Sequence, residues 1–306
     1  MTGSSLIVGS EADLHVQAVI EVCQESGTRP VLIDAESLGT SSWELRGPSL
    51  KLRMNERQIG GAGWLRRLAP PESHSGLTIG SQKAAEAASR LALLVALSSA
   101  PIDWLTDYWT LMRAENKLIQ YRAAACVDVP VPQFEVVSSP ESISASLGDQ
   151  FVVKPLGTGE YRTESDTFAV HSNVIDRSDQ RLYGLVEAPF LIQRLVEATR
   201  HLRVVTVGDQ AWSAALDAEG VPVDWRLDLR AHESWLPVQE PAVERKALNL
   251  SRALGLGFTS QDWIVDLEGE AWFIDGNPAG QWLFLPPEVC DPVTAALALW
   301  LTTGSE

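Results

Sequence analysis

One stretch near the C-terminal end, SQDWIVDLEGEAWFIDGNPAGQW at residues 260–282, constrains the fold of this chain most. Alternating apolar side chains on both sides of a turn at Gly269 predict two strands joined as a hairpin. Asp262 and Asp275 then lie nearly opposite each other. Asn277 follows Asp275 by two residues, so their side chains point to the same face. Two carboxylates and an amide oxygen are therefore predicted to meet at one spot.

The chemistry of these three side chains favours a magnesium site. Oxygen ligands without His or Cys suit Mg²⁺, which is bound through one or two carboxylates together with water and phosphate. The alternative is an exposed hairpin whose aspartates face water. That alternative accounts for acids in the turn, such as Glu268, but poorly for an Asp within an apolar strand. We predict Asp262, Asp275 and Asn277 as the metal ligands.

The rest of the chain alternates between strand and helix patterns, which predicts the α/β (α+β) class. It opens with an apolar strand at 5–9, a helix at 13–26 and a strand at 30–34, the β-α-β order of a parallel sheet. Further helices are predicted at 82–98, 108–126, 140–147, 241–254 and 291–301. Further strands are predicted at 134–137, 150–155, 191–196, 202–207, 211–217, 258–266 and 270–275.

Two lysines stand in contexts that suit a phosphate. Lys117 lies in AENKLIQ on a predicted helix, and Lys154 ends a hydrophobic strand that is followed by Gly157 and Gly159. Glycine lets backbone N–H groups approach a ligand closely. Taken alone, each lysine is better explained as an ordinary surface residue than as a phosphate ligand. The order of the motifs along the chain is what favours a phosphate contact.

Arg203 in HLRVVTVG and Arg226 in VDWRLD are candidates for binding an anion. A planar guanidinium binds phosphate or carboxylate oxygens through two parallel hydrogen bonds, which lysine cannot do. The alternative is a surface arginine paired with an acid such as Asp224 or Asp228. The sequence has no GxSxG or HExxH nucleophile motif, so electrostatic stabilisation is the chemistry we expect.

Charge and cysteine content argue against several classes of partner. The formal net charge of −16 disfavours nucleic acid, whose phosphates need clustered Lys and Arg, although solubility alone explains the charge equally well. No apolar run is long enough to span a bilayer. Three separated cysteines without a CxxC pair favour a reducing cytoplasm. We expect a cytoplasmic protein that meets anions in a local basic pocket.

The hairpin, with its Asp followed thirteen residues later by DGNPAGQW, is similar to the metal-binding hairpin of the ATP-grasp superfamily. The form FIDGNPAGQW resembles the graspetide synthetases, which are microviridin-type ATP-grasp peptide maturases. Most members carry Glu where this chain has Asp275. The motifs AENK, VDVPVPQFEVV, FVVKPLGTG and PFLIQRLVEA follow in the order that the family shows.

This resemblance implies an ATP-grasp fold preceded by a pre-ATP-grasp β-α-β domain. The N-terminal domain would comprise residues 1–102 and the ATP-grasp domain residues 103–306. Within the second domain, residues 130–195 would form a small lid subdomain and residues 196–306 the C-terminal metal-binding subdomain.

The N-terminal segment WLRRLAPP also resembles a motif of this family. In this chain, Trp64, Arg66 and Arg67 of that segment either touch substrate or form a packed tryptophan beside two solvated arginines. Both interpretations are equally open from the sequence.

The resemblance further implies that ATP contacts two lysines, three hinge residues and a histidine, namely Lys117, Lys154, Gln193, Arg194, Leu195 and His201. Gln193 would face the adenine edge. Family members usually have Asp-Leu-Arg after the hinge, with the Asp on the ribose hydroxyls, but this chain has His201 in that position. An imidazole lacks the two-oxygen grip of a carboxylate. Either His201 or Glu197 would then contact the ribose.

By the same resemblance, the chain would be an ADP-forming ligase that uses ATP and Mg²⁺ on a ribosomal precursor peptide with a leader and a core. Asp or Glu side chains would become acyl phosphates, attacked by hydroxyls to give ω-esters or by amines to give ω-amides. Arg203 and Arg226, the latter in the DWR motif, would be the active-site arginines. Two alternatives stay open, a ligase for small amino-acid or carboxylate substrates and a non-catalytic binding protein. A homodimer is one option for the assembly.

Overall fold

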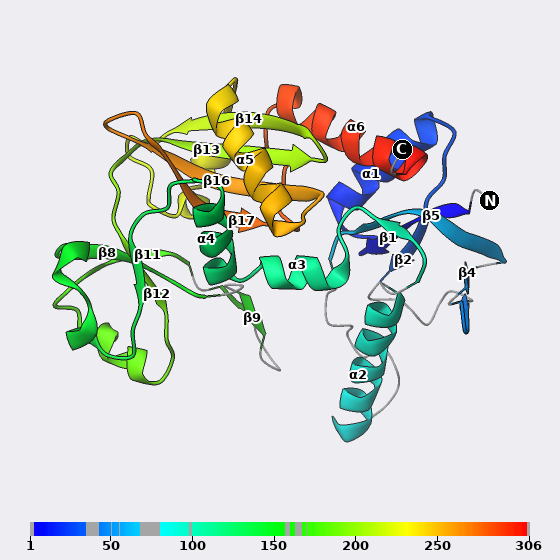
Figure 1. Ribbon diagram of the computed structural model, residues 1–306, viewed down its shortest axis with the longest axis horizontal. Helices are drawn as coiled ribbons and strands as arrows, with labels where there is room; N and C mark the ends of the chain where they lie inside the picture. Colours follow the sequence, from blue (N-terminus) through cyan, green and yellow to red (C-terminus); the bar gives the residue numbers. More distant parts are fainter. Residues whose placement is uncertain are drawn as a thin grey trace.

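The computed structural model describes residues 3–34, 43–49, 51–54, 56–67, 80–97, 100–156, 160–162, 167–169 and 171–304. Within this part, strands and helices form three larger sheets and a two-stranded ribbon, with helices packed on the sheets (Figure 1). The predicted mixed α/β class is therefore confirmed. Gly157 and Gly159 lie outside the described residues.

The N-terminal sheet is built on the predicted β-α-β unit. Strand β1 pairs in parallel with both β2 and β5, and helix α1 begins at Leu14, where the Asp13 carboxylate caps it by accepting from the His15 N–H. The strand order is β2-β1-β5-β4-β3, and β6 pairs in parallel with Ala62 and Gly63 of β5. The bounds are β1 Ser4–Gly9, α1 Leu14–Glu25, β2 Val31–Asp34, β3 Trp43–Arg46, β4 Lys51–Met54, β5 Arg57–Leu65, α2 Gly80–Leu97 and β6 Asp103–Trp104.

The single helix predicted over 108–126 is wrong, because the segment forms two helices. Helix α3 spans Tyr108–Ala114 and helix α4 spans Lys117–Cys126. The break has a local cause. The Asn116 side chain accepts from the N–H groups of the next turn, which starts a new helix at that point. Lys117 consequently becomes the first residue of α4.

A four-stranded antiparallel sheet follows, in the order β11-β8-β12-β7. The two-stranded β9–β10 ribbon lies between β8 and β11 in the chain. The helix predicted near 140–147 is wrong, since two short 3-10 turns stand there, at Pro140–Ser142 and Ala145–Leu147. A third 3-10 segment runs over Gln180–Val186. The strand bounds are β7 Phe134–Val136, β8 Gln150–Lys154, β9 Glu160–Arg162, β10 Thr167–Ala169, β11 Asn173–Asp176 and β12 Leu191–Arg194.

The C-terminal sheet is five-stranded and antiparallel, in the order β15-β14-β13-β16-β17. Helices α4 and α5 cover one face, whereas α6 lies on the other face beside α1 (Figure 1). The side chains of successive β13 residues point to opposite faces of the sheet. Val204 therefore packs toward α5 and Val205 toward α6. The bounds are β13 Ala198–Val207, β14 Gln210–Asp217, β15 Leu236–Val238, α5 Pro241–Leu254, β16 Phe258–Asp266, β17 Ala271–Asn277 and α6 Pro287–Thr303.

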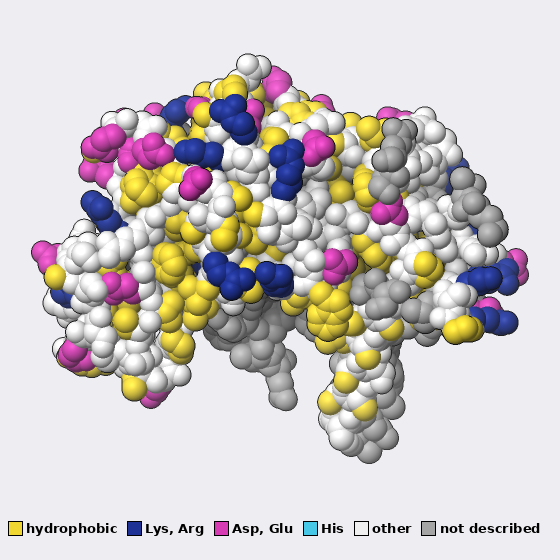
Figure 2. Space-filling view, viewed as in Figure 1, with side chains coloured by type: hydrophobic (Ala, Val, Ile, Leu, Met, Phe, Trp, Pro, Cys, Tyr) yellow, Lys and Arg dark blue, Asp and Glu magenta, His cyan; other side chains and the backbone are white. Residues whose placement is uncertain are grey.

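One hydrophobic core joins the N-terminal and C-terminal sheets. Val19 of α1 and Trp64 of β5 belong to the same buried cluster as Val205 of β13, Trp282 and Leu297 of α6. The division at residue 102 remains a prediction, and β6, just beyond it, pairs with the N-terminal sheet. Across the described residues, no helix combines the length and apolar character that a bilayer crossing requires. Acidic and basic side chains are interspersed on the face in Figure 2.

Candidate active site

The candidate site is centred on the β16–β17 hairpin. The turn at Gly269 is confirmed, and that residue has φ 83°, a conformation that favours glycine. Asp262 and Asp275 are direct cross-strand partners, so their predicted opposition is confirmed as well. Two residues further toward the C-terminal loop, on the same face, Ser260 is paired with Asn277. The hairpin therefore places the three predicted oxygen ligands at two register positions that are two residues apart.

Each of the two carboxylates is held by a cation from another element. The Lys117 ammonium donates to both carboxylate oxygens of Asp275, at 2.8 Å each. The Arg203 guanidinium, on the neighbouring strand β13, donates to Asp262 Oδ1 at 2.7 Å. Both cations are buried, whereas the carboxylates keep about a third of their side-chain surface exposed, 34% for Asp275 and 30% for Asp262. The carboxylates are thus aligned by protein charges yet accessible to a ligand.

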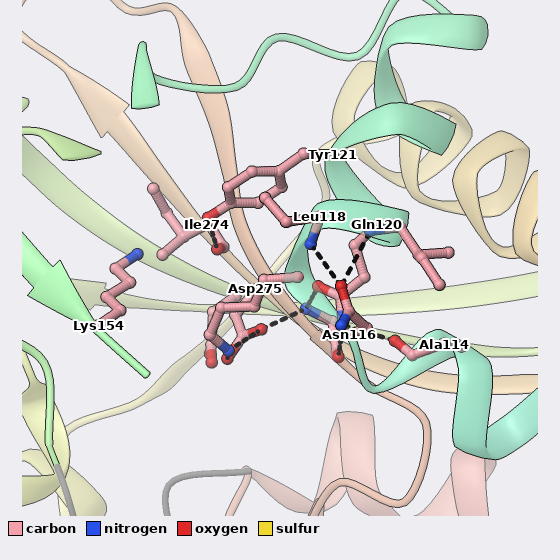
Figure 3. Close-up of polar contacts among 12 residues, drawn as sticks. Ala114, Asn116, Leu118, Gln120, Tyr121, Lys154, Ile274 and Asp275 are labelled. Carbon is pink, nitrogen blue, oxygen red and sulfur yellow. Dashed lines mark hydrogen bonds and ion pairs between the residues drawn. The ribbon is translucent and has the colours of Figure 1, made fainter. Parts of the chain in front are cut away.

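The charge around Asp275 keeps it ionised. Burial alone would raise the pKa of its carboxyl group, but the positive charges of Lys117, Lys154 and Arg226 bring the pKa below its ordinary value. A carboxylate in this form can accept hydrogen bonds or coordinate a cation at neutral pH. Figure 3 shows Asp275 between Lys154, which approaches from β8, and Gln120 of helix α4.

Gln120 holds the backbone between two of the predicted metal ligands, and the sequence analysis did not identify it. Its amide oxygen accepts from the Gly276 N–H at 3.0 Å, and its amide nitrogen donates to the Gly276 carbonyl at 2.6 Å. The same nitrogen donates to the Ala114 carbonyl at 2.7 Å. Gln120 lies three residues after Lys117, on the same helical face. This spacing was the available sequence signal.

Asn277 uses its side-chain oxygen locally. Its Oδ1 accepts from the Ala279 N–H at 3.0 Å, which folds the start of the loop after β17. Two residues on, the Gln281 carbonyl accepts from both Arg203 and Ser260, each at 3.2 Å. The loop therefore connects one predicted metal ligand with the arginine that holds another.

A cavity of about 360 Å³ opens beside the hairpin, between the four-stranded and five-stranded sheets. Eight of the eleven predicted site residues line it: Lys154, Gln193, Arg194, Leu195, His201, Arg226, Asp262 and Asp275. Of the other three, Lys117 and Arg203 adjoin the cavity through their ion pairs with the aspartates. Asn277 lies two residues beyond the lining. The structure thus brings the predicted residues together from five separate strands, helix α4, the segment after β12 and the 3-10 turn Trp225–Leu227.

Lys154 is a buried cation with a neutral partner. Its ammonium is buried in the cavity wall and donates to Gln193 Oε1 at 2.7 Å. The Gln193 amide nitrogen donates to the Tyr121 hydroxyl at 3.1 Å, and that hydroxyl donates to the Ile274 carbonyl at 2.9 Å. Burial lowers the pKa of Lys154 to about 8, while Asp275 opposes this shift. A buried ammonium of this kind favours an added anion.

Of the three predicted hinge residues, Gln193 and Arg194 end strand β12 and Leu195 follows it. Both ends of the Gln193 amide are engaged with Lys154 and Tyr121, so its predicted contact with adenine remains a prediction. The Arg194 side chain is exposed, and the backbone N–H of this residue donates to the Gln133 carbonyl at 2.8 Å. His201 is buried in the cavity wall, and burial lowers the pKa of its imidazole. A neutral imidazole there can give or take one hydrogen bond.

Arg226 is paired with Asp224, as the alternative interpretation proposed. Two hydrogen bonds of 2.7 Å join the guanidinium to the two carboxylate oxygens. Asp224 is buried and also accepts from the Ser172 N–H at 3.2 Å, while His171 lies 3.4 Å away. Arg226 keeps 55% of its side chain exposed at the cavity. The pair therefore presents a fixed guanidinium to the cavity and links the two sheets across it.

Arg66 corrects one N-terminal interpretation. Trp64 is packed as proposed, and Arg67 is exposed, but Arg66 is buried and therefore not solvated. It donates to Asp13 and to backbone carbonyls of the loop after β17. This contact brings the N-terminal sheet to the candidate site.

The side chains at the cavity fit a nucleotide with Mg²⁺. In the described part of the chain, no group of three or more His, Cys, Asp and Glu residues could hold a metal ion alone. Two aspartates with an asparagine leave coordination positions for phosphate and water, as Mg²⁺ prefers. Lys154 would supply positive charge toward a bound polyphosphate. When bound, Mg²⁺ would neutralise phosphate oxygens beside Asp262 and Asp275.

No protein-family model matches the sequence, and no curated protein matches it either. Solved structures, however, share its fold over the whole chain. The chain is similar to a RiPP-associated ATP-grasp ligase of Chryseobacterium gregarium in complex with ADP and a leader and core peptide. The TM-score is 0.87 at 19% identity, and the match covers 100% of this chain and 98% of that chain.

Two further structures agree. The macrocyclase MdnC of Microcystis aeruginosa MRC, bound with precursor peptide MdnA, matches with TM-score 0.82 and 19% identity, over 98% of this chain and 99% of that chain. The ATP-grasp ligase PsnB, complexed with a phosphomimetic variant of minimal precursor, Mg and ADP, matches with TM-score 0.77 and 19% identity. That match covers 99% of this chain and 100% of that chain. This chain therefore has the fold of the ATP-grasp ligases. Its likeness extends to those that were solved with precursor peptides.

Proposed function

We propose that this chain is an ADP-forming ATP-grasp ligase that crosslinks a ribosomal precursor peptide. The observation that carries the proposal is the convergence of Asp262, Asp275 and their two cations beside a cavity lined by a buried lysine. This arrangement supports nucleotide binding with Mg²⁺. The peptide substrate is supported by the full-length likeness to ligases that were crystallised with leader and core peptides.

The proposed reaction has two steps that balance without a redox partner. An Asp or Glu side chain of the peptide takes the γ-phosphoryl group of ATP, which gives an acyl phosphate and ADP. A hydroxyl or amine of the same peptide then attacks the acyl carbon, phosphate leaves and one proton is released. Because phosphate leaves in place of oxide, the second step avoids a very poor leaving group. The product is an ω-ester or an ω-amide, lighter than the peptide by one water.

The residues contribute by position and charge rather than as nucleophiles. Lys154 and Lys117 would hold phosphate oxygens, and the two aspartates with Asn277 would hold Mg²⁺. Arg226, half-exposed and fixed by Asp224, is suited to the incoming carboxylate or to the transferred phosphoryl group. Arg203 is tied to Asp262 and would keep that carboxylate oriented.

Mass spectrometry tests this proposal directly. The protein is incubated with ATP, Mg²⁺ and the peptide of a neighbouring short reading frame rich in Thr or Ser and Glu or Asp. We expect the peptide to lose the mass of one water for each bond, with one ADP formed per bond. Asp275→Ala should abolish both while leaving the far-ultraviolet circular dichroism unchanged. A final product that carries phosphate or adenylate would contradict the proposal. Joining of small amino acids with no change in the peptide would favour the small-molecule ligase.

A further inference from the structure

We propose that His15 and Arg66 of the N-terminal sheet are positioning residues for the nucleotide and metal site. Together with Asp13 they form what we call the N-terminal clamp, which holds loop 278–283 after β17. Through this loop the clamp fixes Asn277 and Arg203. The inference rests on the proposed function and assigns a part in it to a region whose described residues are absent from the cavity lining.

His15 receives the loop through one ring nitrogen. Its Nε2 accepts from the Trp282 N–H at 3.1 Å and from the Leu283 N–H at 3.4 Å. Its Nδ1 lies 3.0 Å from Asp13 Oδ1, a carboxylate oxygen that can only accept, so Nδ1 carries the proton. The Trp282 ring lies edge-on to the imidazole, 4.4 Å between centroids. The tautomer that Asp13 selects is therefore the one that can hold the loop.

Arg66 holds the other end of the same loop. Its Nε donates to Asp13 Oδ2 at 3.0 Å, and its NH1 donates to the Ala279 and Gly280 carbonyls, the latter at 3.1 Å. The guanidinium also lies over the Trp282 ring, 5.5 Å from its centroid. With 1% of its surface exposed, Arg66 is a buried charge whose hydrogen bonds go to one carboxylate and to loop backbone. Such a group fixes geometry more than it adds stability.

The loop carries this constraint to the site in two places. The Ala279 N–H donates to Asn277 Oδ1, so the position of Ala279 sets the rotamer of that predicted ligand. The Gln281 carbonyl accepts from Arg203, which in turn holds Asp262. The loop also has little freedom to shift, since a Cβ on Gly280 would lie 2.4 Å from Ser260 Cβ. Loss of the clamp should therefore displace one metal ligand directly and another through Arg203.

Hydrogen exchange tests the clamp itself, without nucleotide. In His15→Leu, the Trp282 and Leu283 amides should exchange at least tenfold faster than in the wild type. Val19→Ala is the matched control, because Val19 is also buried on the same face of α1 and belongs to the shared core. It should leave these amides within twofold of the wild type. Unchanged exchange in His15→Leu, or equal acceleration in Val19→Ala, would overturn the clamp.

Calorimetry with ADP then tests the link to the site. His15→Leu should weaken ADP binding at least tenfold in the presence of Mg²⁺ and less than twofold in its absence. His15→Gln should restore most of the loss, because its amide oxygen can accept near the place of Nε2. Arg66→Lys is the second variant, should His15→Leu not fold. Lysine keeps a positive charge near Asp13 but lacks the planar guanidinium that donates to Asp13 and to the loop carbonyls at once. We therefore expect the same Mg²⁺-dependent loss of ADP affinity. Equal losses with and without Mg²⁺ would overturn the positioning role.

Failure of the proposed function gives a different result. If the chain binds ADP with Mg²⁺ and His15→Leu shows the selective loss, but no peptide loses water, then the clamp stands and the peptide ligase does not. If the wild type shows no effect of Mg²⁺ on ADP affinity, the positioning role falls together with the metal assignment. The exchange measurement still decides whether the clamp orders the loop.

Discussion

Lys154→Met is the substitution whose consequences follow most fully from the structure. The lysine is 4% exposed, its hydrogen bond goes to the neutral Gln193, and its pKa falls from 10.5 to about 8. A shift of this size means that folding disfavours the charged form by about 3 kcal/mol. Methionine removes that cost and keeps most of the volume, but it leaves Gln193 Oε1 without its donor, at roughly 1 to 3 kcal/mol. The net change at pH 7 should therefore be small, whereas nucleotide binding should be lost.

The pH dependence isolates the charge. The unfolded chain holds the Lys154 proton more tightly than the folded chain, so the cost is fully present below about pH 8. It fades as the pH rises from about 8 toward 10.5, where the unfolded chain also loses the proton. Wild-type stability, measured relative to Lys154→Met, should consequently rise by about 3 kcal/mol across this window. Urea unfolding of both proteins at pH 7 and pH 10 measures the difference.

Two observations would refute this reasoning. One is a difference in unfolding free energy between the two proteins that does not change from pH 7 to pH 10. The other is ATP binding to Lys154→Met that is as tight as binding to the wild type. Lys246→Met on α5 is the matched control, because Lys246 is ion-paired with Glu270 outside the cavity. Its nucleotide affinity should equal that of the wild type.

Three further substitutions test the rest of the site. Arg226→Lys should lower kcat/KM for peptide crosslinking by roughly 100-fold, about 3 kcal/mol, because lysine cannot keep both bonds to Asp224; an unchanged rate would remove Arg226 from the site. Arg203→Met should raise the Mg²⁺ concentration needed for half-maximal ADP formation at least tenfold, and an unshifted Mg²⁺ titration would count against its link to Asp262. Gln120→Leu should lower the unfolding free energy by about 2 kcal/mol, since the Gly276 and Ala114 carbonyls lose the hydrogen bonds that the Gln120 amide donates; chemical denaturation would show whether stability is instead unchanged.

The C-terminal hairpin could be predicted because its information is local. Strand alternation and the glycine turn predict the hairpin in which Asp262 lies opposite Asp275, although the register shifts by one residue between Asp262 and Trp263, an irregularity that the sequence pattern did not predict. The same is true of the β-α-β start and of the helix over 241–254, which begins and ends where periodicity and its proline predict. In each of these segments, residues within one turn or one hairpin determine the structure.

The helix break before Lys117 was also local, yet the sequence analysis passed over it. An asparagine within an otherwise helical pattern was read as part of one helix, whereas its side chain accepts from the N–H groups of a new first turn. The break matters for function, because it places Lys117 at the start of α4, where its ammonium meets Asp275. Capping competes with helix continuation, and here capping prevails.

The ion pairs of the site could not be derived from the sequence. Lys117 and Asp275 are 158 residues apart, and Arg66 is 213 residues from Ala279. Nothing in the local pattern shows which buried cation meets which carboxylate, since that depends on how the sheets pack. The same limit explains why the sequence left Arg66 open between a substrate contact and a solvated position at the surface. Tertiary contacts decide its position.

The most direct test of the central claim is a crystal structure with ADP and Mn²⁺, an ion that scatters anomalously and takes the same oxygen ligands as Mg²⁺. We expect an anomalous peak within coordination distance of Asp262, Asp275 and Asn277, with ADP in the cavity beside Lys154. A peak at other residues, or nucleotide bound away from this cavity, would contradict it.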